Sequence, residues 1–396
     1  MKKLLSILVA TVMLFSTLAI GISAKKSDPS LRFNEDGKFR ILQLADLQDD
    51  TVLNSVAKDF IRTTIENEQP DLIVLSGDNF SGNSVGTNVS HCIDKSLAKK
   101  AINEYMSILE EYGIPVTMVP GNHDDDKIKL TKEEELEMYE KYDCFIGYDA
   151  DPEIYGCGTH NIPIYSSKNA YKLAYNLWMF DSNTYDEELG GYDYIHDDQV
   201  EWYVNKSNEL KEANGGEVVP SIVFQHIIVK EIFDILEECP EGTPNSMPNN
   251  GTFYKFKDEN YKTGNFKEWP CPGTRDSKQF SAMVDQGDVV AMFFGHDHNN
   301  SFEVNYEGID LIATPAFSFS SYGNEDRGFR VIDLDENDTS TYETHIVHWQ
   351  DYYGSSKMAM NHYNMYAQEN SGWVKFTSAL KYLPFALIKA LFGYIF

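Results

Sequence analysis

The sequence predicts an α/β (α+β) fold in which two mixed β-sheets are flanked by helices. Two observations support this prediction. In residues 39–124, short apolar runs alternate with helical segments, which is the pattern of parallel strands joined by crossover helices. After residue 171, apolar runs follow one another more closely and include a hairpin, which indicates further strands and a partly antiparallel arrangement.

The first part of the chain is predicted to fold as β-α-β-α-β. Its strands are the apolar runs RILQLAD, DLIVLSGD and PVTMVPGNHD, at residues 40–46, 71–78 and 115–124. Helices are expected between these strands, at residues 52–68 and 96–112. An acidic helix at residues 132–142 follows, and its charges are typical of a solvated face.

The second part contains more strands than helices. The segment FEVNYEGIDLIAT predicts a hairpin that turns at Glu307 and Gly308. The strands FRVIDLDE and YETHIVHW are expected to form the last, mostly antiparallel edge of a sheet. The other expected elements are a strand at residues 171–182, a helix at Asp197–Ala213, and buried strands at residues 221–226 and 289–298.

Residues 239–275 are rich in Pro, Gly, Asn and Lys and show no periodicity, so they are expected to form a long loop. Two interpretations of this insert remain open. It is either a lid beside the functional site or a surface insertion without a functional role.

Five of the apolar runs end in side chains that can bind a metal ion. Open α/β sheets bind ligands at the carboxyl ends of their strands, so these distant segments are expected to form one polar site. Carboxylate, amide and imidazole groups suit Zn, Mn or Fe. Each segment alone also fits a turn, a helix cap or a buried core histidine, whereas the set favours a metal site. The candidate residues are Asp46, Gln48, Asp78, Asn122, His123, Asp124, His226, His296 and His298.

The motifs D-x-Q, G-D-N, G-N-H-D, H and G-H-D-H, in this order, resemble those of the calcineurin-like metallophosphoesterase superfamily, in its purple-acid-phosphatase-like branch. The resemblance covers residues 39–349 and implies a four-layer α/β/β/α sandwich within a domain at residues 33–350. It also implies two metal ions and a ligand set. Asp46 and His298 would bind the first metal, and Asn122, His226 and His296 would bind the second. Asp78 would bridge the two metals.

The same resemblance implies catalytic roles for His123 and Asp124. His123 would face the substrate, where it stabilises charge or protonates the leaving oxygen. Asp124 would orient His123. Asp297, the third residue of the last motif, has no assigned role beyond shaping the turn.

Two positions depart from the pattern of the family. Gln48 stands where the family usually has a histidine ligand, and a carboxamide oxygen is a poorer donor to Zn or Fe than imidazole. The first metal is therefore expected to be bound more weakly, to be Mn or Mg, or to be lost. Ser81 stands where purple acid phosphatases carry a tyrosine, so their colour is not expected. The expected cofactor is two divalent or trivalent ions of Mn, Zn, Fe or Mg.

The function expected from this site is hydrolysis of phosphate esters by a hydroxide that the two cations generate from water. Monoesters are favoured over diesters because of the branch that the chain resembles. Two alternatives remain open. One is a phosphodiesterase or nucleotidase acting on small substrates, and the other is a non-catalytic binding protein on a decayed phosphatase scaffold, which Gln48 favours.

The charge of the chain limits its partners. With 33 basic and 62 acidic residues, its formal net charge is −29, which repels nucleic-acid backbones and anionic membrane surfaces. A small phosphate ester remains compatible, because bound cations dominate the local field. The expected partner is a small phosphate-ester substrate, and no nucleic-acid duplex is expected.

The N-terminus has the pattern of a signal peptide at residues 1–24. Lys2 and Lys3 precede an apolar run at residues 4–20, and Ala24 ends a small-residue cleavage site. Secretion or location in the cell envelope is therefore expected, with an uncleaved anchor as the alternative.

Export permits disulfides between the five cysteines that follow. Proximity in the sequence favours the pairs Cys144–Cys157 and Cys239–Cys271, which leaves Cys92 unpaired, although the sequence alone does not settle the connectivity.

The composition changes after residue 350. Residues 351–372 are polar and rich in Tyr, Asn and Met, which is typical of a linker. Residues 373–396 are apolar, but Lys381, Pro384 and Lys389 argue against a membrane-spanning helix. Two interpretations remain open: an amphipathic helix that contacts a membrane surface, and a helix that docks on the domain core.

Overall fold

The computed structural model describes residues 31–48, 51–81, 92, 94–124, 128, 130–367 and 370–392, with the backbone alone described for residues 385–392. Within the chain, Leu31–Phe396 forms one compact unit. The expected signal peptide lies outside the described residues, so cleavage and export stay predictions.

The first sheet contains five strands: β2 (Lys38–Leu44), β3 (Leu72–Ser76), β4 (Val116–Val119), β15 (Gly328–Asp335) and β16 (Glu343–His348). Their order is β16-β15-β2-β3-β4. Strands β2, β3 and β4 run parallel, whereas β15 pairs antiparallel with both β2 and β16. The expected parallel part and antiparallel edge are therefore confirmed.

The second sheet contains eight strands: β1 (Leu31–Arg32), β5 (His160–Tyr165), β6 (Leu173–Phe180), β7 (Ser221–Gln225), β11 (Tyr261–Thr263), β12 (Val289–Phe294), β13 (Glu303–Tyr306) and β14 (Ile309–Ala313). Their order is β1-β5-β6-β7-β12-β14-β13-β11, and β6, β7, β12 and β14 are parallel. The predicted hairpin is confirmed. Glu307 and Gly308 form its turn with positive φ angles of 48° and 90°.

The two sheets pack face to face, because their strands carry apolar side chains on both faces. In β2, Phe39 and Ile41 belong to a core that both sheets share, whereas Leu42 and Leu44 pack with Phe60 of the neighbouring helix layer. This period of two explains why the buried strands have continuous apolar sequences. The structure is the four-layer α/β/β/α sandwich that the resemblance implied.

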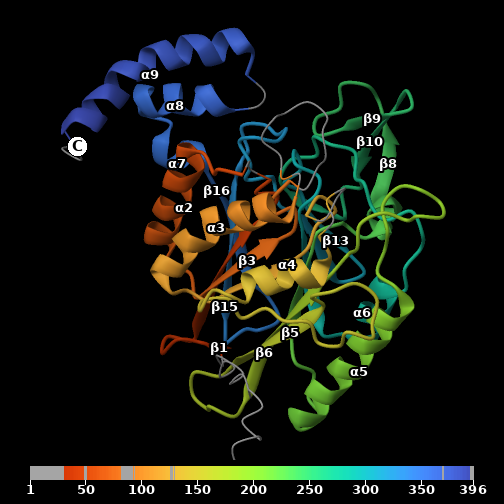
Figure 1. Cartoon of the computed structure of the whole chain (residues 1–396). Helices are drawn as coiled ribbons and strands as arrows, with labels where there is room; N and C mark the ends of the chain where they lie inside the picture. Colours follow the sequence, from red (N-terminus) through yellow and green to blue (C-terminus); the bar gives the residue numbers. More distant parts are fainter. Residues whose placement is uncertain are drawn as a thin grey trace, which may run out of the picture. The chain divides into compact units, whose positions relative to one another are not determined.

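Helices cover the outer face of each sheet (Figure 1). On the five-stranded sheet these are α2 (Ser55–Glu68), α3 (Lys95–Tyr112) and α4 (Lys132–Tyr139), and on the eight-stranded sheet they are α5 (Asp197–Ala213) and α6 (Gln279–Gln286). The side chains of Asn54 and Asp94 accept hydrogen bonds from the first turns of α2 and α3. These caps explain why both helices begin close to the expected positions.

The prediction that residues 239–275 form an irregular loop was wrong. A 3₁₀ helix, η1 (Lys230–Ile235), leads into a small antiparallel sheet of β8 (Leu236–Cys239), β10 (Thr252–Phe256) and β9 (Met247–Asn249). Strand β11 of the same insert joins the edge of the second sheet. These short strands carry mixed polar and apolar side chains, so their pairing depends on tertiary contacts that a sequence pattern does not record.

The segment expected to be a linker is helical, which is a second correction. Helices α7 (Trp349–Tyr353) and α8 (Lys357–Tyr366) follow β16, and α9 (Gly372–Phe392) ends the described chain. Trp349 and Tyr363 are buried in the same core cluster as α2, with ring centroids 4.7 Å apart. The polar composition of the segment gave no indication that these two aromatic side chains are buried in the core. Among the described residues, no helix is long and apolar enough to cross a bilayer.

Neither expected disulfide, Cys144–Cys157 or Cys239–Cys271, is formed, because Cys157, Cys239 and Cys271 are free thiols. Cys157 is buried in the core, and Cys239 is fixed in β8. Cys271 is fixed elsewhere, since its amide donates a hydrogen bond to Asp297. Tertiary contacts therefore override proximity in the sequence.

Candidate metal centre

The predicted ligands lie where strands of the two sheets end. Asp46, Asp78 and Asn122 follow β2, β3 and β4 of the first sheet, and His226 and His296 follow β7 and β12 of the second. All five side chains are buried. Because parallel strands share a carboxyl edge, the fold brings together residues that are far apart in the sequence.

Asp46, Asp78 and His298 form a compact group, with one ligand atom of each within 4.8 Å of the others. The Nε2 of His298 lies 3.3 Å from Asp46 Oδ1, and its Nδ1 lies 2.8 Å from the carbonyl oxygen of Tyr322. A carbonyl oxygen accepts, so Nδ1 carries a proton and Nε2 is directed at the carboxylates, where it would offer its lone pair to a bound cation. Two carboxylates and an imidazole nitrogen are suited to hold a metal ion.

His226 approaches the same carboxylates from the second sheet. Its Nε2 lies 3.3 Å from Asp78 Oδ2 and 3.9 Å from Asp46 Oδ1. Its Nδ1 lies 3.0 Å from the carbonyl oxygen of Ser76, which again directs Nε2 into the site. The other oxygen of Asp78 accepts a hydrogen bond from the His123 amide at 2.8 Å. Asp78 therefore lies between groups of the two sheets, where the expected bridge belongs.

The charges of the site balance one another. Burial raises the pKa of the Asp78 carboxyl, but the charges of His226 and His123 outweigh burial and hold that pKa well below its ordinary value. Burial lowers the pKa of His226, whereas the carboxylates of Asp78 and Asp46 raise it to about 10. A proton on His226 thus offsets carboxylate charge, and a cation bound there would take over that role.

The backbone of the site adopts a conformation that side chains rarely tolerate. Asp46, Gln48, Asp78 and His296 have φ angles of 52°, 28°, 50° and 71°. Such residues cost of order 1–3 kcal/mol each and persist where the surrounding structure fixes them. Across the described residues, nine non-glycine positions have positive φ, so nearly half of them belong to this site. This concentration is typical of a functional site.

One buried polar atom of the site, Oδ1 of Asn122, has no hydrogen-bond partner among the described residues. Nε2 of His226 faces the carboxylates of Asp78 and Asp46. The amide of Asn122 is oriented by its Nδ2, which donates to the hydroxyl of Tyr185 at 3.2 Å. Buried polar groups are normally satisfied, so the unpartnered oxygen of Asn122 indicates a ligand. A cation fits this oxygen, because it can donate a lone pair, and a bound cation would displace the proton of His226 so that Nε2 could do the same.

Gln48 lies beside the expected bridge. Its Nε2 donates to Asp78 Oδ2 at 2.5 Å, and its backbone amide donates to the Asp78 carbonyl at 2.9 Å. The amide nitrogen, and not the oxygen, therefore faces the carboxylate. Coordination of a cation would require the amide to turn over, so the ligand role of Gln48 stays a prediction.

His123 and Asp124 share one turn but make different contacts. His123 is half-buried, and its backbone amide binds Asp78. The buried carboxylate of Asp124 accepts hydrogen bonds from the amides of Gly121 at 2.7 Å and Phe80 at 3.1 Å, which ties together the turns after β4 and β3. Burial, and then the charge of Asp78, raise the pKa of Asp124 to about 8. The expected orientation of His123 by Asp124 stays a prediction.

Comparison with known proteins agrees with this arrangement. The family model described as "Calcineurin-like phosphoesterase" matches residues 39–300, which is more than half of the chain. The chain belongs to the calcineurin-like phosphoesterase family.

Curated relatives of this calcineurin-like phosphoesterase are similar over most of its length. The chain is 27% identical over 327 residues to "Probable inactive purple acid phosphatase 14" of Arabidopsis thaliana, covering 74% of each protein. It is 28% identical over 349 residues to "Probable inactive purple acid phosphatase 29" of the same plant, covering 80% of this chain and 82% of the relative. Among solved structures, a dimetal phosphatase from Danio rerio aligns with a TM-score of 0.45 and 12% identity, over 77% of this chain and 98% of that one. The predicted superfamily and its purple-acid-phosphatase-like relatives are confirmed.

Two motif glycines of this calcineurin-like phosphoesterase are required by close packing. A Cβ added at Gly77, whose φ is +92°, would lie 2.5 Å from Nδ1 of His226. A Cβ added at Gly121 would lie 2.2 Å from the backbone nitrogen of Asp78 and 2.3 Å from its Oδ1. Ordinary contacts of this kind measure 3.4–4 Å, so these glycines allow the turns to approach the ligands.

Three tyrosines that the motifs did not reveal surround the ligands. Tyr192 meets the ring of His296 edge-on with centroids 4.4 Å apart, and it stacks on Tyr185 at 5.7 Å. Tyr322 stacks on His298 at 3.9 Å. A signal for the first two was present in the run YDEELGGYDY, which follows a predicted strand and therefore reaches the same sheet edge.

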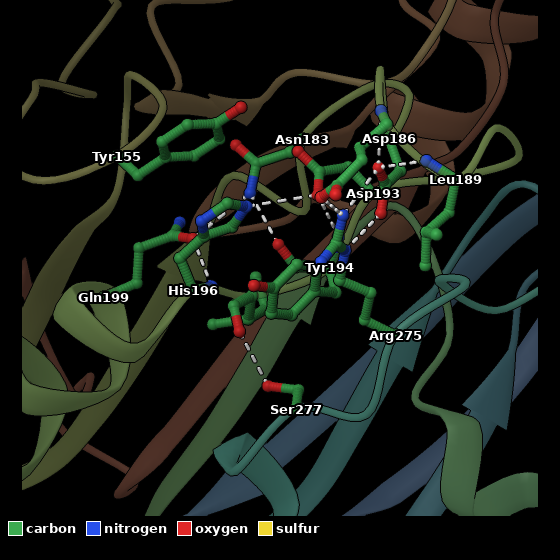
Figure 2. Close-up of polar contacts among 12 residues, drawn as sticks. Tyr155, Asn183, Asp186, Leu189, Asp193, Tyr194, His196, Gln199, Arg275 and Ser277 are labelled. Atoms are coloured by element: carbon green, nitrogen blue, oxygen red, sulfur yellow. Dashed lines mark hydrogen bonds and ion pairs between the residues drawn. The ribbon is translucent and has the colours of Figure 1, made fainter.

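The loop that carries Tyr185 and Tyr192 is held by ion pairs and hydrogen bonds. Figure 2 shows Arg275 directed at Asp186, and the same guanidinium also pairs with Glu188. The adjacent residue, Thr274, donates its amide proton to the carbonyl of Tyr192 at 2.8 Å. The end of the insert thus fixes the tyrosine-bearing loop beside the metal centre.

Asp297, which had no expected role beyond its turn, anchors the other side of the insert. Its carboxylate accepts a hydrogen bond from the Cys271 amide at 3.3 Å, and Glu268 accepts one from the Asn299 amide at 3.0 Å. The insert therefore lies against the turn that carries the last two predicted histidine ligands. Its movement as a lid stays a prediction.

Proposed function

We propose that this chain is an exported phosphomonoesterase that depends on two metal ions. The observation that carries the proposal is the position of Asp78. Its Oδ2 faces His226 at 3.3 Å, its Oδ1 binds the backbone of the turn that holds His123, and it belongs to the cluster with Asp46 and His298. A carboxylate with both oxygens in use between two ligand groups supports a bridge between cations.

The chain's residues divide into two ligand sets around this carboxylate. Asp46 and His298 form the first set, with Gln48 next to it. Asn122, His226 and His296 form the second. The unpartnered Asn122 Oδ1 supports a cation there. Bound cations supply activation of the attacking water and neutralisation of charge on the phosphoryl oxygens.

His123 would supply the proton that the leaving oxygen needs. It is half-buried, which keeps it within reach of a ligand, and its backbone is tied to Asp78 at 2.8 Å. Imidazole suits this role because its proton exchanges near neutral pH. The exposed rings of Tyr185 and Tyr322 border the ligands and would contact the ester group.

Three further features support the finer parts of the proposal. The relatives carry the name of purple acid phosphatases, which favours a monoester substrate. The signal-peptide pattern at residues 1–24 favours export. The net charge of −29 agrees with a small ester and disagrees with a nucleic-acid duplex.

A second candidate is a binding protein that has kept the phosphatase scaffold and lost catalysis. The observation that favours it is Gln48, whose amide nitrogen faces the bridge position. Relatives named as inactive purple acid phosphatases point the same way. The presence of His123 and of a full second ligand set weighs against it.

Hydrolysis of p-nitrophenyl phosphate tests the proposal. The chain from Lys25 onward is treated with chelator and then reloaded with Mn, Zn, Fe or Mg. Hydrolysis should vanish with chelator, return with metal and exceed that of bis(p-nitrophenyl) phosphate. Asp78→Asn should abolish hydrolysis, whereas Asp335→Asn, which alters a surface carboxylate paired with Lys38, should not.

Each alternative predicts a different result in the same experiment. Metal binding without hydrolysis of either ester would favour the binding protein. Faster hydrolysis of the diester would favour the phosphodiesterase. Undiminished hydrolysis by rigorously metal-free protein would reject the proposal.

A further inference from the structure

Helix α9 exposes a row of large apolar side chains. Trp373, Phe376, Leu380 and Leu383 are 72%, 55%, 55% and 53% exposed. Their spacing of three and four residues places them on one face of the helix. Single exposed hydrophobic residues are ordinary on a protein surface, whereas a continuous row of four marks an interaction surface.

The opposite face of α9 packs on the domain through smaller or more polar groups. Ser378 is 3% exposed, and the ring of Tyr382 stacks on His362 of α8 with centroids 4.3 Å apart. Over residues 372–384, where the side chains are described, the helix is therefore docked by its less apolar side. Because a surface helix normally buries its apolar face, this reversed orientation indicates that the outer face has a partner of its own.

The charge of this segment is opposite to that of the rest of the chain. Residues 371–396 contain Lys375, Lys381 and Lys389 and no Asp or Glu, although the whole chain has a net charge of −29. If two copies paired through this face, their lysines would repel one another, which disfavours a second copy as the partner. An anionic lipid surface repels the acidic remainder of the chain, but this repulsion is screened with distance, whereas the lysines of the segment lie at the contact. There the surface attracts the lysines and accepts the apolar side chains beside them.

We propose that the exposed face of α9 binds the surface of an anionic lipid bilayer. The four apolar side chains would enter the boundary between head groups and acyl chains. The lysines would extend toward lipid phosphates while their stems cover apolar surface. This binding would hold the domain beside a membrane, and it is independent of the proposed hydrolysis.

Co-sedimentation with lipid vesicles tests this proposal. The chain from Lys25 onward contains the whole compact unit Leu31–Phe396 and lacks the apolar run of residues 4–20, which would itself enter lipid. It should sediment with vesicles of phosphatidylglycerol and phosphatidylcholine, and far less with phosphatidylcholine alone. Binding should weaken at about 0.5 M salt, since screening reduces the attraction of the lysines.

Two variants separate the apolar and the charged contributions. Serine at Trp373, Phe376, Leu380 and Leu383 should lower the vesicle partition coefficient at least about tenfold, because apolar burial drives insertion. The pair Lys375→Gln and Lys381→Gln should lower it about fivefold for each lysine at low salt, with the apolar face intact.

The matched control removes apolar side chains of similar exposure elsewhere. Tyr171 and Leu189 are 94% and 60% exposed, so Tyr171→Ser and Leu189→Ser should leave vesicle binding unchanged. The proposal is overturned if the parent chain does not sediment with anionic vesicles, or if both α9 variants bind the vesicles as well as the parent does. A different pair of results would identify a second copy as the partner. In that case the parent would dimerise without binding vesicles, and the serine variant would no longer dimerise.

Discussion

Replacing Gly121 with alanine should disable the metal centre without removing any ligand. The added Cβ would lie 2.2 Å from the backbone nitrogen of Asp78 and 2.3 Å from its Oδ1, where ordinary contacts measure 3.4–4 Å. The turns after β3 and β4 must therefore separate by about 1 Å, a displacement that typically costs about a hundredfold in rate when it moves catalytic groups. The accompanying overpacking should lower the free energy of unfolding by about 1–3 kcal/mol.

Elemental analysis and hydrolysis of an aryl phosphate measure the effect. Gly372→Ala is the matched control, because no atom lies within 4 Å of its added Cβ and neither Gly372 nor Gly121 has a left-handed φ. The control should keep the metal content and turnover of the parent. If Gly121→Ala also keeps both, the close approach of Gly121 does not position Asp78 and the reasoning fails.

Three further predictions concern single side chains. Asp78→Ala should lose both cations and Asp46→Ala only one, because Asp78 contacts both ligand sets; elemental analysis that finds two metals in Asp78→Ala would reject the bridge. His123→Ala should keep its metals but lose about 10²–10⁴-fold in turnover, with smaller losses for substrates with good leaving groups; equal losses would indicate charge stabilisation instead. Acid should destabilise the fold through His160, whose burial lowers its pKa from 6.5 to about 4. Between these values the unfolded chain binds more protons, so the free energy of unfolding falls as pH falls, by about 2 kcal/mol at pH 5. Urea titrations at pH 7 and pH 5 should show that the change in the free energy of unfolding between these pH values differs by about 2 kcal/mol between the parent and His160→Gln, with the larger loss of stability toward acid in the parent.

The central strands could be predicted because burial on both faces leaves a direct trace in the sequence. In β3, Leu72 and Val74 pack between the sheets while Ile73 and Leu75 face the helices, so the run is apolar throughout. Strand β10 left no such trace. Its side chains are mostly half-buried, and it exists because β8 and β9 pair with it.

The gathering of the candidate residues could be predicted because their positions at strand ends and their motif order agree, while their role as metal ligands stays a prediction. The surrounding layer could not be predicted in the same way. Tyr322 stacks on His298 from a position 24 residues away and belongs to no motif. The direction of the Gln48 amide depends on its contact with Asp78, which only the folded chain provides.

The central claim is the proposal that Asp78 would bridge two bound cations. Anomalous diffraction from crystals grown with Mn²⁺ tests it most directly. Two peaks are predicted, about 3.5–4 Å apart, one beside Asp46 and His298 and the other beside Asn122 and His226. A single peak, or none at these side chains, in crystals of protein that hydrolyses an aryl phosphate would contradict the two-metal account.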